Sequence, residues 1–67
     1  MLIQIKRKNG KYVYYERIIR AVPMEDEKDG KFLLMERSDG NISKAFNIAS
    51  YIVYSDNVEY KLGEHSI

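Results

Sequence analysis

An acidic segment, residues 25 to 36, has the residue types and spacing that could bind calcium. If Gly30 takes the sixth position of a calcium-binding loop, the liganding positions one, three, five and twelve all hold carboxylates. These carboxylates are Glu25, Glu27, Asp29 and Glu36. Such a loop needs a helix on each side, whereas Pro23 and strand-forming residues flank this one. We therefore expect a solvated loop between two strands, with no metal and no cofactor.

Residue types that act as catalytic nucleophiles and bases are scarce. The 67 residues include no Cys and one His, His65, close to the C-terminus. A nucleophile needs an adjacent base, and neither Ser50 nor Ser55 has an evident partner. The lack of Cys also excludes disulfides and thiolate metal sites. The composition predicts no enzyme activity and no small-molecule substrate.

Basic and aromatic residues concentrate at the start of the chain. Residues 1 to 22 carry six basic residues and one acidic residue, whereas residues 23 to 67 carry five basic and nine acidic residues. Proteins that bind single-stranded nucleic acid combine a basic groove with rings on which bases stack. The candidates for such a site are Lys6, Lys8, Lys11, Tyr15 and Arg20. Because the net charge is only +1, nucleic-acid binding is the alternative and not the leading hypothesis.

Turn residues divide the chain into short apolar segments. Asn9-Gly10 and Asp39-Gly40 are strong signals for two-residue hairpin turns, because these residue types tolerate positive φ. The segments between the turns are rich in Ile, Val, Tyr, Phe and Leu, which favours strands. Residues 15 to 22 also fit an amphipathic helix, and residues 44 to 52 are similarly ambiguous. We favour a long bent strand for residues 15 to 22.

A two-residue turn at Asn9-Gly10 predicts the register of the first hairpin. It places Tyr12 and Tyr14 on the core face, together with the isoleucines of the first strand. A bulge near Glu16-Arg17 is then needed to keep charges out of the core, and after it Ile19 turns inward. Three apolar side chains are left on the outer face of the long strand: Val13, Tyr15 and Ile18.

These patterns predict one small all-β domain over residues 1–67. We expect a strongly bent antiparallel sheet of five to six strands, which a bulged long strand could close into an SH3-like barrel. The barrel is an architectural analogy and implies no function. We identify no internal repeat and no segment of the length and apolarity that a membrane span requires.

An outer cluster of Val13, Tyr15 and Ile18, rimmed by Lys and Arg, is typical of a protein interface. A chain this short buries only about 60% of its unfolded surface, so association would also stabilise it. The leading hypothesis is a non-enzymatic binding module that contacts a protein partner or a second copy of itself. The lack of Cys and of a signal peptide predicts a cytoplasmic location. The Lys-, Ile-, Tyr- and Asn-rich usage suits an accessory or phage-type gene of a low-GC bacterium.

Overall fold

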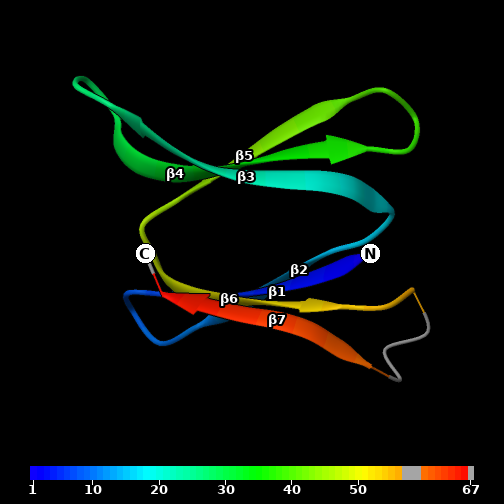
Figure 1. Cartoon of the computed structure of the whole chain (residues 1–67). Coiled ribbons are helices and arrows are strands. Elements are labelled where there is room, and N and C mark those ends of the chain that lie inside the picture. The colour runs from blue at the N-terminus through cyan, green and yellow to red at the C-terminus, as the bar shows by residue number, and fades with distance from the viewer. Residues whose placement is uncertain (57–59, 67) are drawn as a thin grey trace.

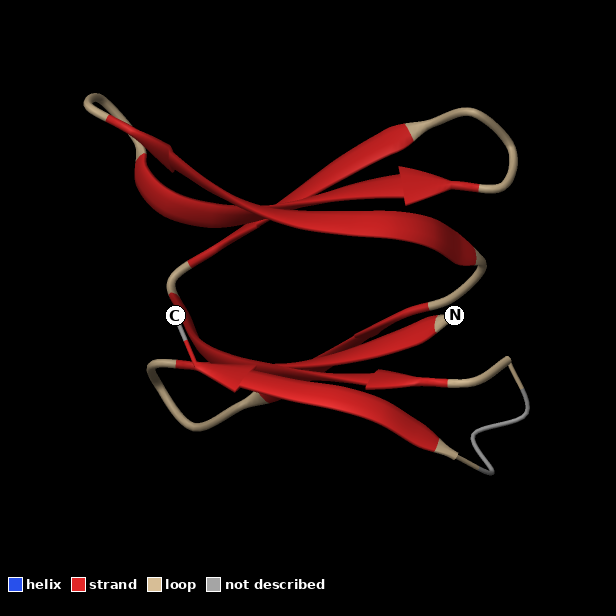
Figure 2. Cartoon of the chain, in the orientation of Figure 1, coloured by secondary structure: helices blue, strands red, loops and turns tan. Residues whose placement is uncertain are grey.

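Seven strands form two antiparallel sheets that lie face to face as two layers (Figure 1, Figure 2). The computed structural model describes residues 1–56 and 60–66. The strands are β1 (Leu2–Arg7), β2 (Tyr12–Tyr15), β3 (Ile18–Asp26), β4 (Gly30–Arg37), β5 (Ile42–Phe46), β6 (Ile48–Tyr54) and β7 (Lys61–Ser66). The described residues contain no helix, so the predicted all-β class is confirmed.

The strands divide into sheet A, with the order β2-β1-β6-β7, and sheet B, with the order β3-β4-β5. The chain passes between the sheets at two short junctions, Glu16-Arg17 before β3 and Asn47 before β6. Arg17 and Asn47 both adopt the left-handed backbone conformation, with φ of 58° and 57°. Such a residue turns the chain sharply between two extended segments. The described strands therefore form a two-sheet sandwich, and the closed barrel is not found.

The loop of the first hairpin is one residue longer than predicted. Gly10 donates a backbone hydrogen bond to the Arg7 carbonyl at 2.9 Å, and the Arg7 N–H donates to the Lys11 carbonyl at 2.8 Å. Lys8, Asn9 and Gly10 thus form a three-residue loop, and Gly10 supplies its left-handed position with φ of 86°. Asn9-Gly10 is a turn, as expected, but the two-residue register is wrong.

Because of the longer loop, the β2 side chains predicted to face the core face solvent, and those predicted to face solvent face the core. Ile5 pairs with Val13 and Ile3 with Tyr15, because one added loop residue shifts the pairing by one position. Tyr15 is partly buried against the core cluster, whereas Tyr12 and Tyr14 are 53% and 58% exposed. The predicted inward positions of Tyr12 and Tyr14, and the outward position of Tyr15, are therefore wrong.

The side chains of β3 also face the opposite sides from those predicted. Ile18 is 1% exposed and belongs to the core, whereas Ile19 is 59% exposed. The expected irregularity exists, since Arg17 is left-handed and the pairing with β4 shifts between Ile18 and Arg20. Because the chain changes sheet there, Ile18 starts a new strand over the core. It does not continue the outer face of β2.

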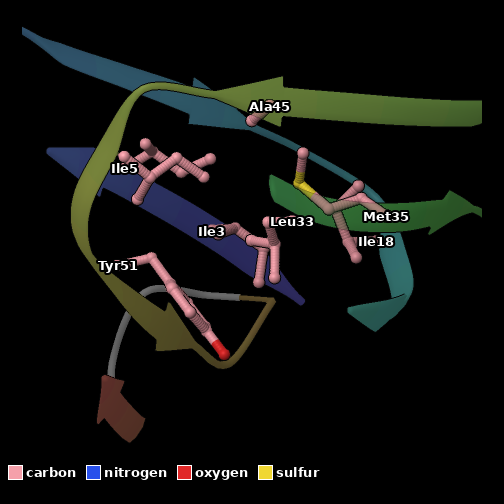
Figure 3. Packing of buried hydrophobic residues seen from close by; sticks show 8 residues of the cluster. Ile3, Ile5, Ile18, Leu33, Met35, Ala45 and Tyr51 are labelled. Carbon is pink, nitrogen blue, oxygen red and sulfur yellow. The ribbon is translucent and has the colours of Figure 1, made fainter. Parts of the chain in front are cut away.

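The core lies between the two sheets and draws on both (Figure 3). Sheet A contributes Ile3, Ile5, Ile48 and Tyr51, and sheet B contributes Ile18, Leu33, Met35 and Ala45. No polar or charged side chain is buried among the described residues. Apolar burial between the sheets therefore holds the two layers together.

Strands β1 to β3 and strands β4 to β6 repeat one pattern of pairing, a structural repeat that the sequence analysis does not identify. Every partner pair between β1 and β2 has a counterpart between β4 and β5 in which both residue numbers are 30 higher. The β1–β6 and β4–β3 pairs correspond in the same way, including their register shifts. Examples are Ile3–Tyr15 with Leu33–Ala45, Ile5–Val13 with Met35–Ser43, and Arg7–Ile48 with Arg37–Ile18.

Hydrogen bonds between the loops and junctions follow the same correspondence. The Lys8 N–H donates to the Asn47 carbonyl at 2.9 Å, and the Ser38 N–H donates to the Arg17 carbonyl at 2.9 Å. Each hairpin loop is thus tied to the junction of the other unit. This reciprocal arrangement is that of a two-fold dimer, here within a single chain. We refer to β1–β3 as the first unit and to β4–β6 as the second unit.

The core exchanges large and small residues between equivalent positions. Tyr15 in the first unit corresponds to Ala45 in the second, whereas Ala21 in the first corresponds to Tyr51 in the second. Both tyrosines lie in sheet A and both alanines in sheet B. Each unit therefore contributes one large and one small side chain at these two positions, which keeps their summed volume similar in the two units.

Candidate functional site

The outer face of sheet B carries an apolar cluster. Because Leu33 and Met35 of β4 lie in the core, the alternating residues of that strand face outward. The register places outward residues of β3 and β5 beside them on either side. We call this surface the apolar face, and it consists of Val22, Met24, Phe32, Leu34, Ile42 and Phe46.

Phe32 is the centre of the apolar face. Its ring lies 5.3 Å from the ring of Phe46, between centroids, and the Lys44 ammonium lies 5.5 Å from its centroid. Phe32 is only 7% exposed although it is not part of the core cluster between the sheets. Its neighbours Met24 and Phe46 remain exposed at 43% and 37%. Phe32 is thus covered from outside by residues that themselves face solvent.

Charged residues on and beside the apolar face pair with one another. Arg20 lies across from Glu36 and forms an ion pair with an N–O distance of 3.4 Å. Glu25 and Lys31 also lie across from each other, but on the side of the sheet opposite to Phe32. Lys44 is a further charged residue of the face. An exposed pair such as Arg20–Glu36 contributes about 0–1 kcal/mol, so it offsets two charges of the face without stabilising the fold strongly.

The outer face of sheet A has a different character. Tyr12 lies across from Lys6, and Tyr14 lies across from Gln4. On the other side of β1, the Tyr54 hydroxyl donates a hydrogen bond of 3.1 Å to Gln4 Oε1. We call this surface the tyrosine face, and it consists of Gln4, Lys6, Tyr12, Tyr14, Ile52 and Tyr54.

One acidic residue near the tyrosine face is neutralised. Glu64 of β7 lies across from Ile52 and forms an ion pair of 2.6 Å with Lys61. The hydrogen bond from Lys61 lowers the pKa of Glu64, and the same bond raises the pKa of Lys61. Both side chains therefore stay charged over a wider pH range, and their charges offset each other.

The predicted interface residues do not form an outer cluster. Ile18 lies in the core, Tyr15 packs against it, and Val13 is half-buried opposite Ile5. None of the three belongs to either outer face. The residues that do face outward on β2, Tyr12 and Tyr14, were missed because the turn signal is the same for loops of two and three residues.

The predicted nucleic-acid residues separate into two groups. Lys6, Lys8 and Lys11 lie on the first hairpin, beside or at the end of the tyrosine face. Tyr15 faces the core and Arg20 lies in sheet B, paired with Glu36. The structure thus brings three of the five predicted residues together.

The acidic segment forms a hairpin. Asp26 Oδ1 accepts hydrogen bonds from the Lys28 and Asp29 N–H groups at 2.7 and 3.3 Å, and Gly30 is left-handed with φ of 75°. Within residues 1–56 and 60–66, no group of three or more His, Cys, Asp or Glu side chains is arranged to hold a metal ion. The Asp26 carboxylate closes the turn between β3 and β4.

His65 lies in β7 and not in a frayed tail. Its ring is stacked at 4.9 Å on Tyr51 with a 31° tilt. Burial raises the pKa of the Tyr51 phenol above its usual value. A Cβ at Gly63 would lie 2.8 Å from His65 Nε2, so glycine at this position leaves room for the stack.

No family model, no curated protein and no solved structure matches this chain. The part of the chain that the structure describes has no helix that is long and apolar enough to cross a bilayer.

Proposed function

We propose that this chain is a non-enzymatic binding module that acts through protein–protein contact, and that a second copy of the chain docks on the apolar face. The observation that carries the proposal is the row of Met24, Phe32 and Phe46 across three strands, with Ile42 exposed on the same face. Contiguous apolar surface of this kind marks interaction sites. A cytoplasmic location belongs to this proposal and rests on the Cys-free composition.

The internal repeat indicates that these apolar residues are not required for folding, which supports a role for them in binding. Two apolar-face residues, Leu34 and Ile42, correspond in the first unit to Gln4 and Tyr12. The two units have the same pairing, so the fold accepts polar or amphipathic residues at these positions. The apolar character of the sheet B face is therefore not a requirement of the architecture.

The charge of the face favours a second copy as the occupant. Arg20 and Glu36 offset each other within the face, and the Lys44 ammonium lies over the Phe32 ring. Two copies can therefore approach face to face without strong repulsion between like charges. Association would also bury apolar surface that a protein of this size leaves exposed.

The molar mass in solution tests this proposal. Light scattering over a series of concentrations should show a reversible dimer of the unaltered chain. A double variant, Met24→Thr with Ile42→Thr, should shift the equilibrium to the monomer, because threonine keeps the strand preference and removes the apolar contact. Tyr12→Thr is the matched control, since Tyr12 is equivalent to Ile42 and equally exposed, at 53% against 52%.

A chain that is strictly monomeric at every concentration would refute self-association. If Tyr12→Thr weakened the dimer as much as the double variant did, docking on the apolar face would be refuted, because the contact would then involve the other sheet.

A further inference from the structure

We propose that the tyrosine face binds single-stranded nucleic acid, with Tyr12 and Tyr14 stacking on bases and Lys6, Lys8 and Lys11 contacting phosphates. This site lies on sheet A, so it is independent of the docking surface proposed on sheet B. The supporting observations are the exposure and spacing of the two rings, the positions of the lysines, and a comparison with the equivalent surface of the second unit.

The two rings form a short platform. Tyr12 and Tyr14 are both more than half exposed and lie on the same side of β2. Residues two apart on a strand are spaced by about 7 Å, so the rings can receive two successive bases of a strand whose bases are unstacked from each other. Stacking on tyrosine is tolerant of sequence because every base has a π-face.

The lysines lie where a phosphate backbone would pass. Lys6 is the cross-strand partner of Tyr12. Lys8 lies in the hairpin loop and Lys11 directly precedes β2, so both are at the Tyr12 end of the platform. The acidic side chain nearest to this face on β7, Glu64, is paired with Lys61 at 2.6 Å. The end of the face near Tyr12 is therefore net positive, which complements a polyanion.

Polar groups next to Tyr12 can contact a base edge. A recess of about 180 Å³ lies beside this ring, and Gln4, Lys6 and Ser50 are among its lining residues, together with the Glu64 carboxylate that is paired with Lys61. Amide, ammonium and hydroxyl groups supply both donors and acceptors. A base stacked on Tyr12 would thus have hydrogen-bonding partners at its edge as well as a ring beneath it.

The second unit shows that the fold does not demand these residues. The five proposed contact positions have equivalents 30 residues later with the same strand pairing or the same loop hydrogen bonds. There, none of the three lysines is retained, and neither position of the platform is aromatic. The corresponding pairs are Lys6 and Glu36, Lys8 and Ser38, Lys11 and Asn41, Tyr12 and Ile42, and Tyr14 and Lys44.

Anisotropy of fluorescent oligothymidylate and oligouridylate tests the site, with the full chain as the binding protein. We expect binding at about 50 mM salt that weakens steeply as salt is raised, since phosphate contacts release counterions. Tyr12→Leu and Tyr14→Leu keep an apolar side chain on the strand but remove the ring. Each should raise Kd by roughly 5- to 150-fold, which corresponds to the usual value of one stacked base.

Ile42→Leu and Lys44→Leu are the matched controls, because they make the same substitution at the equivalent positions of the second unit. We expect Kd to change by less than about twofold in both. Thermal unfolding of each variant confirms that the protein is folded, and Tyr12→Phe should retain binding because it retains the ring.

Two results would overturn the proposal. One is no detectable binding of either oligonucleotide at about 50 mM salt, where phosphate contacts are strongest. The other is binding that the two tyrosine variants leave unchanged and that heparin displaces, because this would be attraction to any polyanion without stacking. Neither result affects the molar mass, so the self-association proposal stands or falls separately.

Discussion

At the scale of single residues, Ile18 and Ile48 show how the chain changes sheets. Each follows a left-handed residue, Arg17 or Asn47, and each is almost fully buried. An L-residue other than glycine pays a conformational cost in the left-handed region. Burial of the next isoleucine offsets that cost, since a fully buried aliphatic side chain contributes about 1.5–3 kcal/mol. The left-handed conformation at each junction is therefore stabilised by the buried isoleucine that directly follows it.

The orientation of the β3 side chains can be tested by making the same change, isoleucine to threonine, separately at two adjacent positions. Ile18→Thr should lower the free energy of unfolding by at least about 2 kcal/mol, because it leaves a void and buries a hydroxyl in the core. Ile19→Thr should change it by less than about 0.5 kcal/mol, as is usual for an exposed residue. Urea denaturation measures both. Equal losses, or a larger loss at Ile19, would contradict the observed orientation.

At the scale of elements, β3 is an edge strand of its sheet whereas β6 is an inner strand, and this difference needs an explanation. The two strands are equivalent in the repeat, yet only β6 has an additional neighbour, β7, on its other edge. Val53 of β6 pairs with Gly63 of β7, and the equivalent of Val53 in β3 is Pro23. Proline lacks an N–H and is tolerated in sheets where its nitrogen faces a free edge. Pro23 therefore protects the β3 edge from strand addition.

Pro23→Val should make the protein more prone to aggregate, because it restores a backbone donor on an unpaired edge. We expect faster growth of thioflavin fluorescence during agitation of the variant at equal concentration. Glu25→Val is the control, because it adds the same residue to the same strand without adding a donor. If both variants aggregate at the same rate, added hydrophobicity and not the new N–H is responsible.

At the scale of the whole molecule, the chain has the architecture of a two-fold dimer joined into one polypeptide. In this arrangement Met1 is equivalent to Lys31 and Asp56 to Asp26. Asp26 and Lys31 are joined by a short hairpin loop, and the Met1 amine lies 2.6 Å from Asp56 Oδ1. The ends of β6 and β1 thus lie close together, as the corresponding ends of β3 and β4 do.

A circular permutant tests the equivalence of the units. It consists of residues 31–56, the loop sequence Glu-Lys-Asp-Gly, and residues 1–26. We expect it to fold with β1 still paired with β6, because closing a short loop between adjacent strand ends costs little entropy. Cross-strand NMR contacts between these strands report the pairing. Residues 1–56 in native order are the control, since both chains lack β7; a folded control with an unfolded permutant would refute the equivalence.

The sequence by itself determined the all-β class and the hairpin turns, because these depend on local preferences. It did not separate β2 from β3, and it did not decide between strand and helix for residues 44 to 52. Asn9-Gly10 and Asp39-Gly40 both occupy hairpin loops, and the acidic segment is a turn between two strands as expected. Apolar runs between such turns become strands whatever they pack against. These features could therefore be predicted without knowledge of any long-range contact.

Only the tertiary structure decided which side chains face outward, and the candidate surfaces depend on that choice. Side chains alternate with a period of two, so a single added loop residue moved Tyr12 and Tyr14 to solvent and Tyr15 toward the core. The sheet change at Arg17 reversed β3 in the same way. The repeat is hidden in the sequence for a related reason. The two units share a pattern of strand pairing, but equivalent positions such as Tyr15 and Ala45 hold different residue types, and the pairing forms only in the folded chain.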